Sequence, residues 1–105
     1  MERVARFRAG FLEAGGDPAV LEHVIGIVIV CEYGRGDFER AWRPYDHANP
    51  LYMSRAQFHP DSWARAGGGD PADDHQVGAN VARWLSMIGI EAAGTTSGWV
   101  VCWNR

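Results

Sequence analysis

The segment that most limits the possible folds is an almost wholly apolar stretch, residues 19–33. A helix that is apolar all round has to be surrounded by other elements, so this stretch predicts the central element of a core. Asp17 and Pro18 precede it as an N-cap and a first-turn proline. The β-branched residues within it would also suit a buried strand, but the cap and the length favour a helix.

The remaining elements are arranged around this one. Residues 2–14 predict a first helix that ends at Gly15-Gly16, with an apolar stripe made of Val4, Phe7, Phe11 and Leu12. Pro60 predicts a short helix through Trp63, and Asp70-Pro71 the start of a helix that ends at Gly89. Its apolar face consists of Val77, Val81, Leu85 and Ile88.

Residues 34–58 show no lasting period and predict irregular structure. The apolar tail, residues 98–103, is expected to pack back on the core. A chain of 105 residues is long enough for one modest core. We therefore expect one compact domain, residues 1–105, mainly α with little or no sheet.

Composition argues against several functional classes. Ten basic and thirteen acidic residues are dispersed along the chain, so no basic patch for nucleic acid is expected. The longest apolar run, residues 24–31, is far shorter than the roughly 20 residues of a membrane span. The histidines lack the close spacing of a zinc pair, and no phosphate-binding glycine loop is present, so no metal or cofactor is expected. The first residues lack a signal peptide's apolar stretch. The protein is therefore expected to be exported by another route or to be a domain of a larger protein. We expect it to be a monomer or part of such a larger protein.

Cys31 and Cys102 are the two cysteines. Composition leaves two interpretations open: buried free thiols, or a disulfide that closes a long loop and implies an oxidising compartment.

Glu32 is an unusual residue for its position. It follows an apolar run and precedes Tyr33-Gly34, where the helix should end. Apolar surroundings and the negative end of a helix dipole both favour the protonated carboxyl. A carboxylic acid that is still protonated near neutral pH can donate its proton to a glycosidic oxygen. The plainer alternative is a solvated carboxylate at a helix end.

Four segments, in order, resemble a known family. Cys31-Glu32-Tyr33-Gly34 is similar to the Cys-Glu-Ser-Gly motif of soluble lytic transglycosylases, goose-type lysozymes and resuscitation-promoting factors. Residues 53–63, with Gln57, Phe58, Pro60 and Trp63 in register, resemble that family's Gln-Phe-x-Pro-Ser-Thr-Trp segment. Residues 67–85 resemble the stretch that follows, and Trp99-Val100-Val101-Cys102 the ending of resuscitation-promoting factors.

The resemblance implies a lysozyme-like fold that cleaves the β-1,4 bond between N-acetylmuramic acid and N-acetylglucosamine in peptidoglycan strands. Glu32 would be the general acid and then the base, Gln57 would line the site, and Cys31 would pair with Cys102. Such a protein acts outside the cytoplasm, at a cell envelope or on a phage particle. The product, anhydro-sugar or hydrolysed, stays open, and so does a scaffold that binds cell-wall glycan without cutting it.

Further site residues follow from this comparison. Tyr33, Ser54 and Arg55 depart from the family motif and are expected to contact the substrate. For Arg55 a solvated surface position is an equal alternative. Tyr45 and Tyr52 flank a polar loop and are expected to stack on sugar rings.

Two further predictions concern tryptophans of the core and a second carboxylate. Trp63 and Trp84, at helical positions, are expected in the core. Asp37 and Asp46 are the available second carboxylates of a glycosidase, although each also fits a turn.

Overall fold

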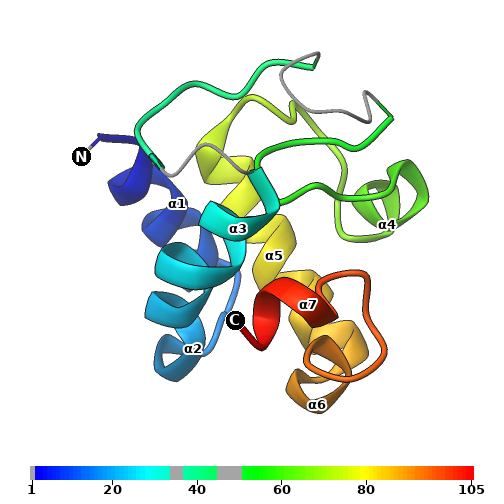
Figure 1. Cartoon of the computed structure of the whole chain (residues 1–105). Helices are drawn as coiled ribbons and strands as arrows, with labels where there is room; N and C mark the ends of the chain where they lie inside the picture. Colours follow the sequence, from blue (N-terminus) through cyan, green and yellow to red (C-terminus); the bar gives the residue numbers. More distant parts are fainter. Residues whose placement is uncertain (1, 34–36, 45–50) are drawn as a thin grey trace.

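The computed structural model describes residues 2–33, 37–44 and 51–105, which form one globule with extents of 30 × 26 × 26 Å (Figure 1). The helical elements are α1 (Glu2–Glu13), α2 (Pro18–His23), the π-helix η1 (Val24–Ile29), α3 (Val30–Tyr33), α4 (Pro60–Arg65), α5 (Asp74–Ile88), α6 (Ile90–Ala93) and α7 (Val100–Trp103). Within the described residues the only β contact is an isolated antiparallel bridge between Met53 and Phe58. The prediction of a mainly α chain with little or no sheet is confirmed.

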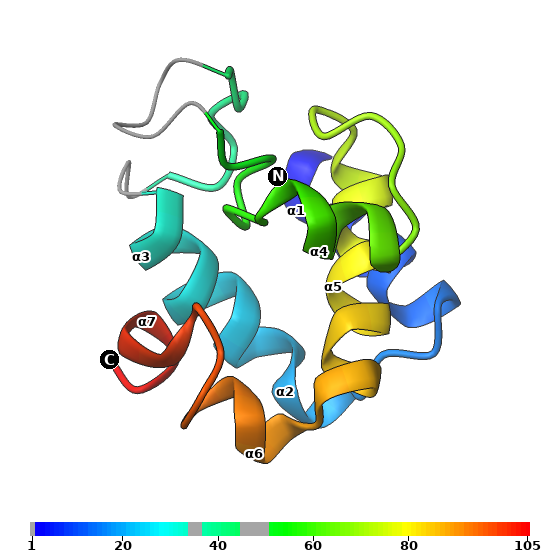
Figure 2. The same ribbon diagram turned by 90° about the vertical axis from the view of Figure 1, so that its right-hand side faces the viewer.

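Elements α2, η1 and α3 follow one another without a break and form one helical run (Figure 2). The predicted N-cap is present, because Asp17 Oδ1 accepts the Ala19 N–H at 2.9 Å. The helix is therefore correct and the alternative strand is not. Its middle, however, is wound as a π-helix, a form that is rare and concentrated at functional sites. Ile27 is also 39% exposed, so one side of the run faces solvent.

The most extensive helix pair consists of α1 and α5. Glycine lets the two backbones approach closely: a Cβ on Gly10 would lie 1.9 Å from His75 O, and one on Gly78 would lie 2.1 Å from Phe7 O. Phe7 and Val77 are fully buried where the helices meet. The expected stripe of α1 needs one correction, because Leu12 is 46% exposed. Consecutive helical residues point about 100° apart, so burying Phe11 turns Leu12 aside.

Helix α5 begins one turn later than predicted. Its N-cap is Asp73, whose side chain accepts the His75 N–H at 3.1 Å. Asp70 instead accepts the Ala72 N–H at 2.9 Å and so closes a separate turn. An aspartate followed by proline suits that turn as well as a helix start, which is why the pattern misplaced the boundary. The predicted end at Gly89 is confirmed.

The C-terminal tail packs back on the core as predicted, with Trp99 and Cys102 both buried. A disulfide joins Cys31 to Cys102 across a Cα–Cα distance of 5.5 Å, and it fastens α7 to α3. The interpretation of two free thiols is therefore excluded. Among the described residues, no helix has both the length and the apolar character that a membrane crossing requires.

Candidate active site

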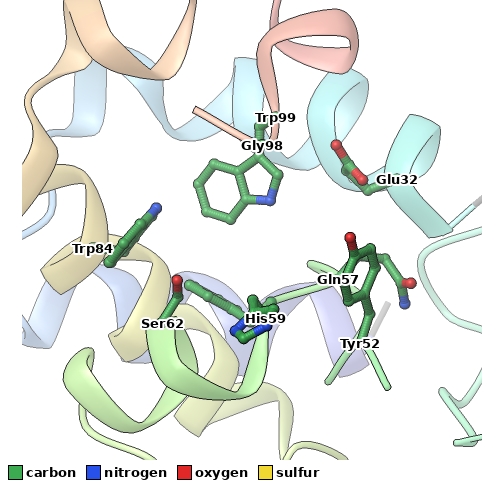
Figure 3. A pocket seen from close by; sticks show the side chains of 9 residues that line it. Glu32, Tyr52, Gln57, His59, Ser62, Trp84, Gly98 and Trp99 are labelled. Atoms are coloured by element: carbon green, nitrogen blue, oxygen red, sulfur yellow. The ribbon is translucent and has the colours of Figure 1, made fainter. Parts of the chain in front are cut away.

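A cleft of about 180 Å³ lies between α3 on one side and α4 and α5 on the other, with the 51–59 loop between them. Its lining combines one carboxyl group with aromatic and small polar side chains: Glu32, Tyr52, Gln57, Phe58, His59, Ser62, Trp84, Gly98 and Trp99. In Figure 3 the labelled residues of this lining lie around a common space. A concave, largely aromatic site with a few polar groups is the usual form of a ligand pocket.

Among the described residues, Glu32 contributes the only carboxyl group of this lining. It lies in α3, directly after Cys31, so the disulfide to α7 fixes the backbone that carries it. Burial raises the pKa of the Glu32 carboxyl from 4.5 to about 7, because a partly desolvated carboxylate is less stable than the neutral acid. The acid can therefore still hold its proton near neutral pH while facing the cleft.

Gln57 lies near Glu32 in a tight loop (Figure 3). Met53 and Phe58 close the loop by exchanging two backbone hydrogen bonds of 2.8 and 2.9 Å. Ser54 and Gln57 both have positive φ, 67° and 55°, a conformation that non-glycine residues rarely adopt and that concentrates at functional sites.

The two ends of the Gln57 amide differ. Nε2 donates to Ser54 O at 2.9 Å, whereas Oε1 is buried without a hydrogen-bond partner in the described part of the chain. A buried acceptor without a partner costs free energy, and this oxygen belongs to a side chain that lines the cleft.

Phe58 organises the aromatic wall. Its ring makes edge-to-face contacts with Trp63, Trp84 and Trp99 at centroid distances of 5.4, 6.2 and 5.3 Å. Trp63 is buried, as predicted, while Trp84 is only partly buried and lines the cleft. Trp99 is tied to the loop through its Nε1, which donates to Ala56 O at 2.8 Å.

The structure corrects the expectation for Arg55. Instead of facing the substrate, Arg55 is fully buried. Its guanidinium donates to Asp74 Oδ1 at 2.7 Å and to the carbonyl oxygens of Phe38 and Arg40 at 2.6 and 2.9 Å. It also lies 4.6 Å from the centre of the Phe38 ring. Arg55 thus joins three segments of the fold and is not part of the cleft lining.

Ser54 and Tyr33 are also turned away from the cleft. Ser54 is fully buried, and its Oγ accepts the Ala56 N–H at 3.1 Å. Tyr33 is 3% exposed, and its hydroxyl donates to Ala41 O at 3.0 Å. Both side chains hold loops together, which corrects their expected role as substrate contacts. Tyr52, in contrast, lines the cleft and is 36% exposed.

Two predicted residues, Tyr45 and Asp46, lie outside the described residues. Asp37 is exposed, and its carboxylate accepts the Glu39 N–H at 2.9 Å, as in a turn. It does not line the cleft. Glu32 therefore has no second carboxylate beside it among the residues that the structure places there. Nor do three or more His, Cys, Asp or Glu side chains converge on a possible metal position in the described ranges.

Sequence reasoning missed six of the residues that line the cleft: Phe58, His59, Ser62, Trp84, Gly98 and Trp99. His59 and Ser62 flank Pro60 at the start of α4, and a helix start marks a cap but not the direction of a cleft. Trp84 has helical spacing to the buried face of α5, and this spacing predicted a core position. A tryptophan rarely becomes fully buried because of its size, which was the available signal.

Comparison with known proteins adds no relative. Neither the protein-family models, nor the curated proteins, nor the solved structures include a match to this chain.

Proposed function

We propose that this chain is a peptidoglycan-cleaving enzyme of the lytic transglycosylase or lysozyme type, with Glu32 as its general acid. The observation that carries the proposal is a partly buried glutamate that faces an aromatic cleft. The resemblance of the four sequence segments supports the same conclusion and gives the substrate, the β-1,4 bond between N-acetylmuramic acid and N-acetylglucosamine.

In the proposed reaction Glu32 gives its proton to the glycosidic oxygen as the bond from that oxygen to C1 breaks. Positive charge then develops on the muramoyl ring, and the new Glu32 carboxylate would stabilise it. The carboxylate next accepts a proton from the nucleophile that attacks C1. If the nucleophile is the C6 hydroxyl of the same sugar, the product is a 1,6-anhydro ring; if it is water, the product is a reducing end.

Other cleft residues would hold the substrate. The side chain of Gln57, which lines the cleft beside Glu32, would form a hydrogen bond with a sugar hydroxyl or acetamido group. The Tyr52 and Trp99 rings would contact the apolar C–H faces of the sugars. The disulfide favours an oxidising compartment, in agreement with action on a cell envelope or from a phage particle.

The test compares Glu32→Gln with the parent in a peptidoglycan turbidity assay. Glutamine has nearly the same shape but no acidic proton, so lytic activity should fall by about 10² to 10⁴ with an unchanged fold. Glu91→Gln, which neutralises an exposed glutamate of α6 outside the cleft, is the matched control and should remain active. More than a tenth of the parent activity in Glu32→Gln would contradict the assignment.

A second candidate is a glycan-binding module without catalysis. The feature that favours it is the cleft's aromatic wall, which can hold sugar whether or not Glu32 acts. A parent protein that pulls down peptidoglycan but never reduces its turbidity would establish this alternative. Mass spectrometry of released fragments would identify the anhydro or hydrolysed product of an active protein.

A further inference from the structure

The end of the cleft formed by α4 and α5 contains side chains that the proposed chemistry does not use. In Figure 3, Trp84 and Ser62 lie across the cleft from Glu32, and His59 lies between them and Gln57. Neither the Ser62 hydroxyl nor the Trp84 indole N–H has a hydrogen-bond partner within the described segments. This end therefore combines an aromatic surface with free polar groups.

His59 has a defined hydrogen-bonding direction. As the N-cap of α4, its Nδ1 accepts the Asp61 N–H at 3.2 Å. Pro60 has no N–H, so Asp61 supplies the first backbone donor of this helix that needs a partner. Since Nδ1 accepts, the neutral ring carries its proton on Nε2. The cap thus leaves His59 with an N–H donor for a molecule in the cleft.

Trp84 is held in place from behind. Its ring packs edge-to-face against buried Phe58, with a centroid distance of 6.2 Å and an interplanar angle of 80°. The rest of the indole is partly exposed on the cleft wall. A rigid indole supplies a large apolar surface at little cost in conformational entropy, and its N–H adds a polar contact. An apolar ring face edged by hydrogen-bonding groups complements a pyranose.

We propose that this end of the cleft is a second sugar-binding position, away from the bond that is cut. A pyranose would stack on Trp84, and its hydroxyl or acetamido oxygens would accept hydrogen bonds from His59 Nε2 and Ser62 Oγ. This inference rests on the proposed function, from which the glycan substrate is taken. The position acts on binding, so it determines KM and the preference for longer strands, and leaves kcat unchanged.

The test is calorimetric titration with the β-1,4-linked tetramer of N-acetylglucosamine, made in the Glu32→Gln background so that no cleavage occurs. His59→Asn removes the imidazole donor, but asparagine is a strong N-cap and preserves α4. We expect the Kd for the tetramer to rise about two- to tenfold, as for one net hydrogen bond. Trp84→Leu should raise it about tenfold or more, through the loss of the aromatic surface.

Two controls match these variants outside the cleft. His75→Asn changes a part-exposed histidine whose Nε2 contacts Glu13 at 2.6 Å. Trp103→Leu removes a partly buried tryptophan that packs against His23. Both should leave the Kd unchanged. Against a peptidoglycan suspension, with Glu32 restored, His59→Asn should raise KM and keep kcat.

The second sugar position and the enzymatic activity are tested by different outcomes. Tetramer binding that His59→Asn and Trp84→Leu leave within twofold of the Glu32→Gln protein would overturn the second position, whether or not the parent is lytic. Absence of lysis by the parent would overturn the enzymatic proposal alone, while weakened tetramer binding by the same two variants would still support the second position. If the tetramer does not bind to the parent cleft, the inference is overturned.

Discussion

Two acidic side chains, Glu32 and Asp74, are both removed from solvent but differ in how their charge is compensated. Asp74 is buried and receives hydrogen bonds from Arg55 and Arg3 at 2.7 and 3.1 Å. Compensation of this kind is what a buried charge needs. Glu32 is partly buried, and burial is the cause of its raised pKa. A protein tolerates such a carboxyl at a cost in stability, which is typical of functional sites.

The first prediction at this scale concerns pH. If protonated Glu32 is the acid, kcat/KM should be level below neutrality and fall as pH rises through about 7. The pKa is raised in the folded state. The stability that Glu32 contributes is therefore complete below pH 4.5, the value expected when unfolded, and is lost as pH rises toward 7. Activity profiles and denaturant titrations from pH 4 to 9 check both parts.

Glu32→Gln is the control for this pH dependence. It should be more stable than the parent above pH 7, because glutamine has no charge to desolvate there, and its stability should vary less between pH 4.5 and 7. A parent activity that rises through pH 7, or a variant less stable than the parent at pH 8, would contradict the buried acid.

Arg55 gives the second prediction at the residue scale. Among the described side chains, Arg55→Ala leaves Arg3 as the remaining donor to Asp74, and it removes the donors to Phe38 O and Arg40 O. Breaking a buried pair from one side typically costs about 3 to 5 kcal/mol. Urea denaturation should show a loss of this size, and Arg55→Ala/Asp74→Asn should recover part of it. Normal stability with weakened glycan binding would instead place Arg55 in the cleft.

At the scale of elements, the space around a glycine differs between a tightly packed helix pair and a helix that faces solvent. Gly10 and Gly78 lie where α1 meets α5, and neither has room for a Cβ. Gly26 lies in η1, is exposed, and has no atom within 4 Å of the space that a Cβ would fill. Glycine is thus required for close packing between α1 and α5, whereas at Gly26 in η1 there is room for a side chain.

Alanine substitutions should therefore have opposite effects. Gly78→Ala places a methyl group against the Phe7 carbonyl and should destabilise the fold by about 1 to 3 kcal/mol. Gly26→Ala should stabilise it by about 0.5 to 1 kcal/mol, because alanine loses less backbone entropy in a helix. Thermal melting of both variants checks the pair. A stabilising Gly78→Ala would mean that α1 and α5 are further apart than described.

At the scale of the whole molecule, the disulfide connects two helices beside the cleft, α3 and α7. It joins α3, which carries Glu32, to α7, whose N-cap is Trp99, across 71 residues of sequence. Trp99 in turn bonds to the 51–59 loop through Ala56. The arrangement of Glu32 and Trp99 in the cleft therefore depends on a covalent bond between residues that are far apart in sequence.

Reduction of this bond should lower stability markedly. A loop of this length constrains the unfolded chain by roughly 4 kcal/mol in the entropic account, and each kcal/mol corresponds to roughly 4 to 8 °C for a domain of this size. The melting temperature should fall by more than about 10 °C, as measured by calorimetry with and without reductant. Cys31→Ser/Cys102→Ser should reproduce the fall and be insensitive to reductant. Two freely alkylated thiols in protein made under oxidising conditions would contradict the bond.

Local patterns predicted most of the fold. The caps and glycines placed α1, the α2–α3 run, α4 and the end of α5 near their observed bounds, because these signals act within one helical turn. The apolar run that precedes Glu32 indicated a carboxyl with a raised pKa, and burial raises that pKa to about 7.

Contacts between distant segments determined the rest. Arg55 is buried because Asp74, Phe38 and Arg40 meet around it, and no local pattern contains that meeting. Trp84 became a cleft residue because Phe58 occupies the space behind it. The periodicity of α5 shows which residues face inward, but whether that side is core or cleft depends on what packs opposite. The lining of a site is set by such long-range packing, and one sequence records it only indirectly.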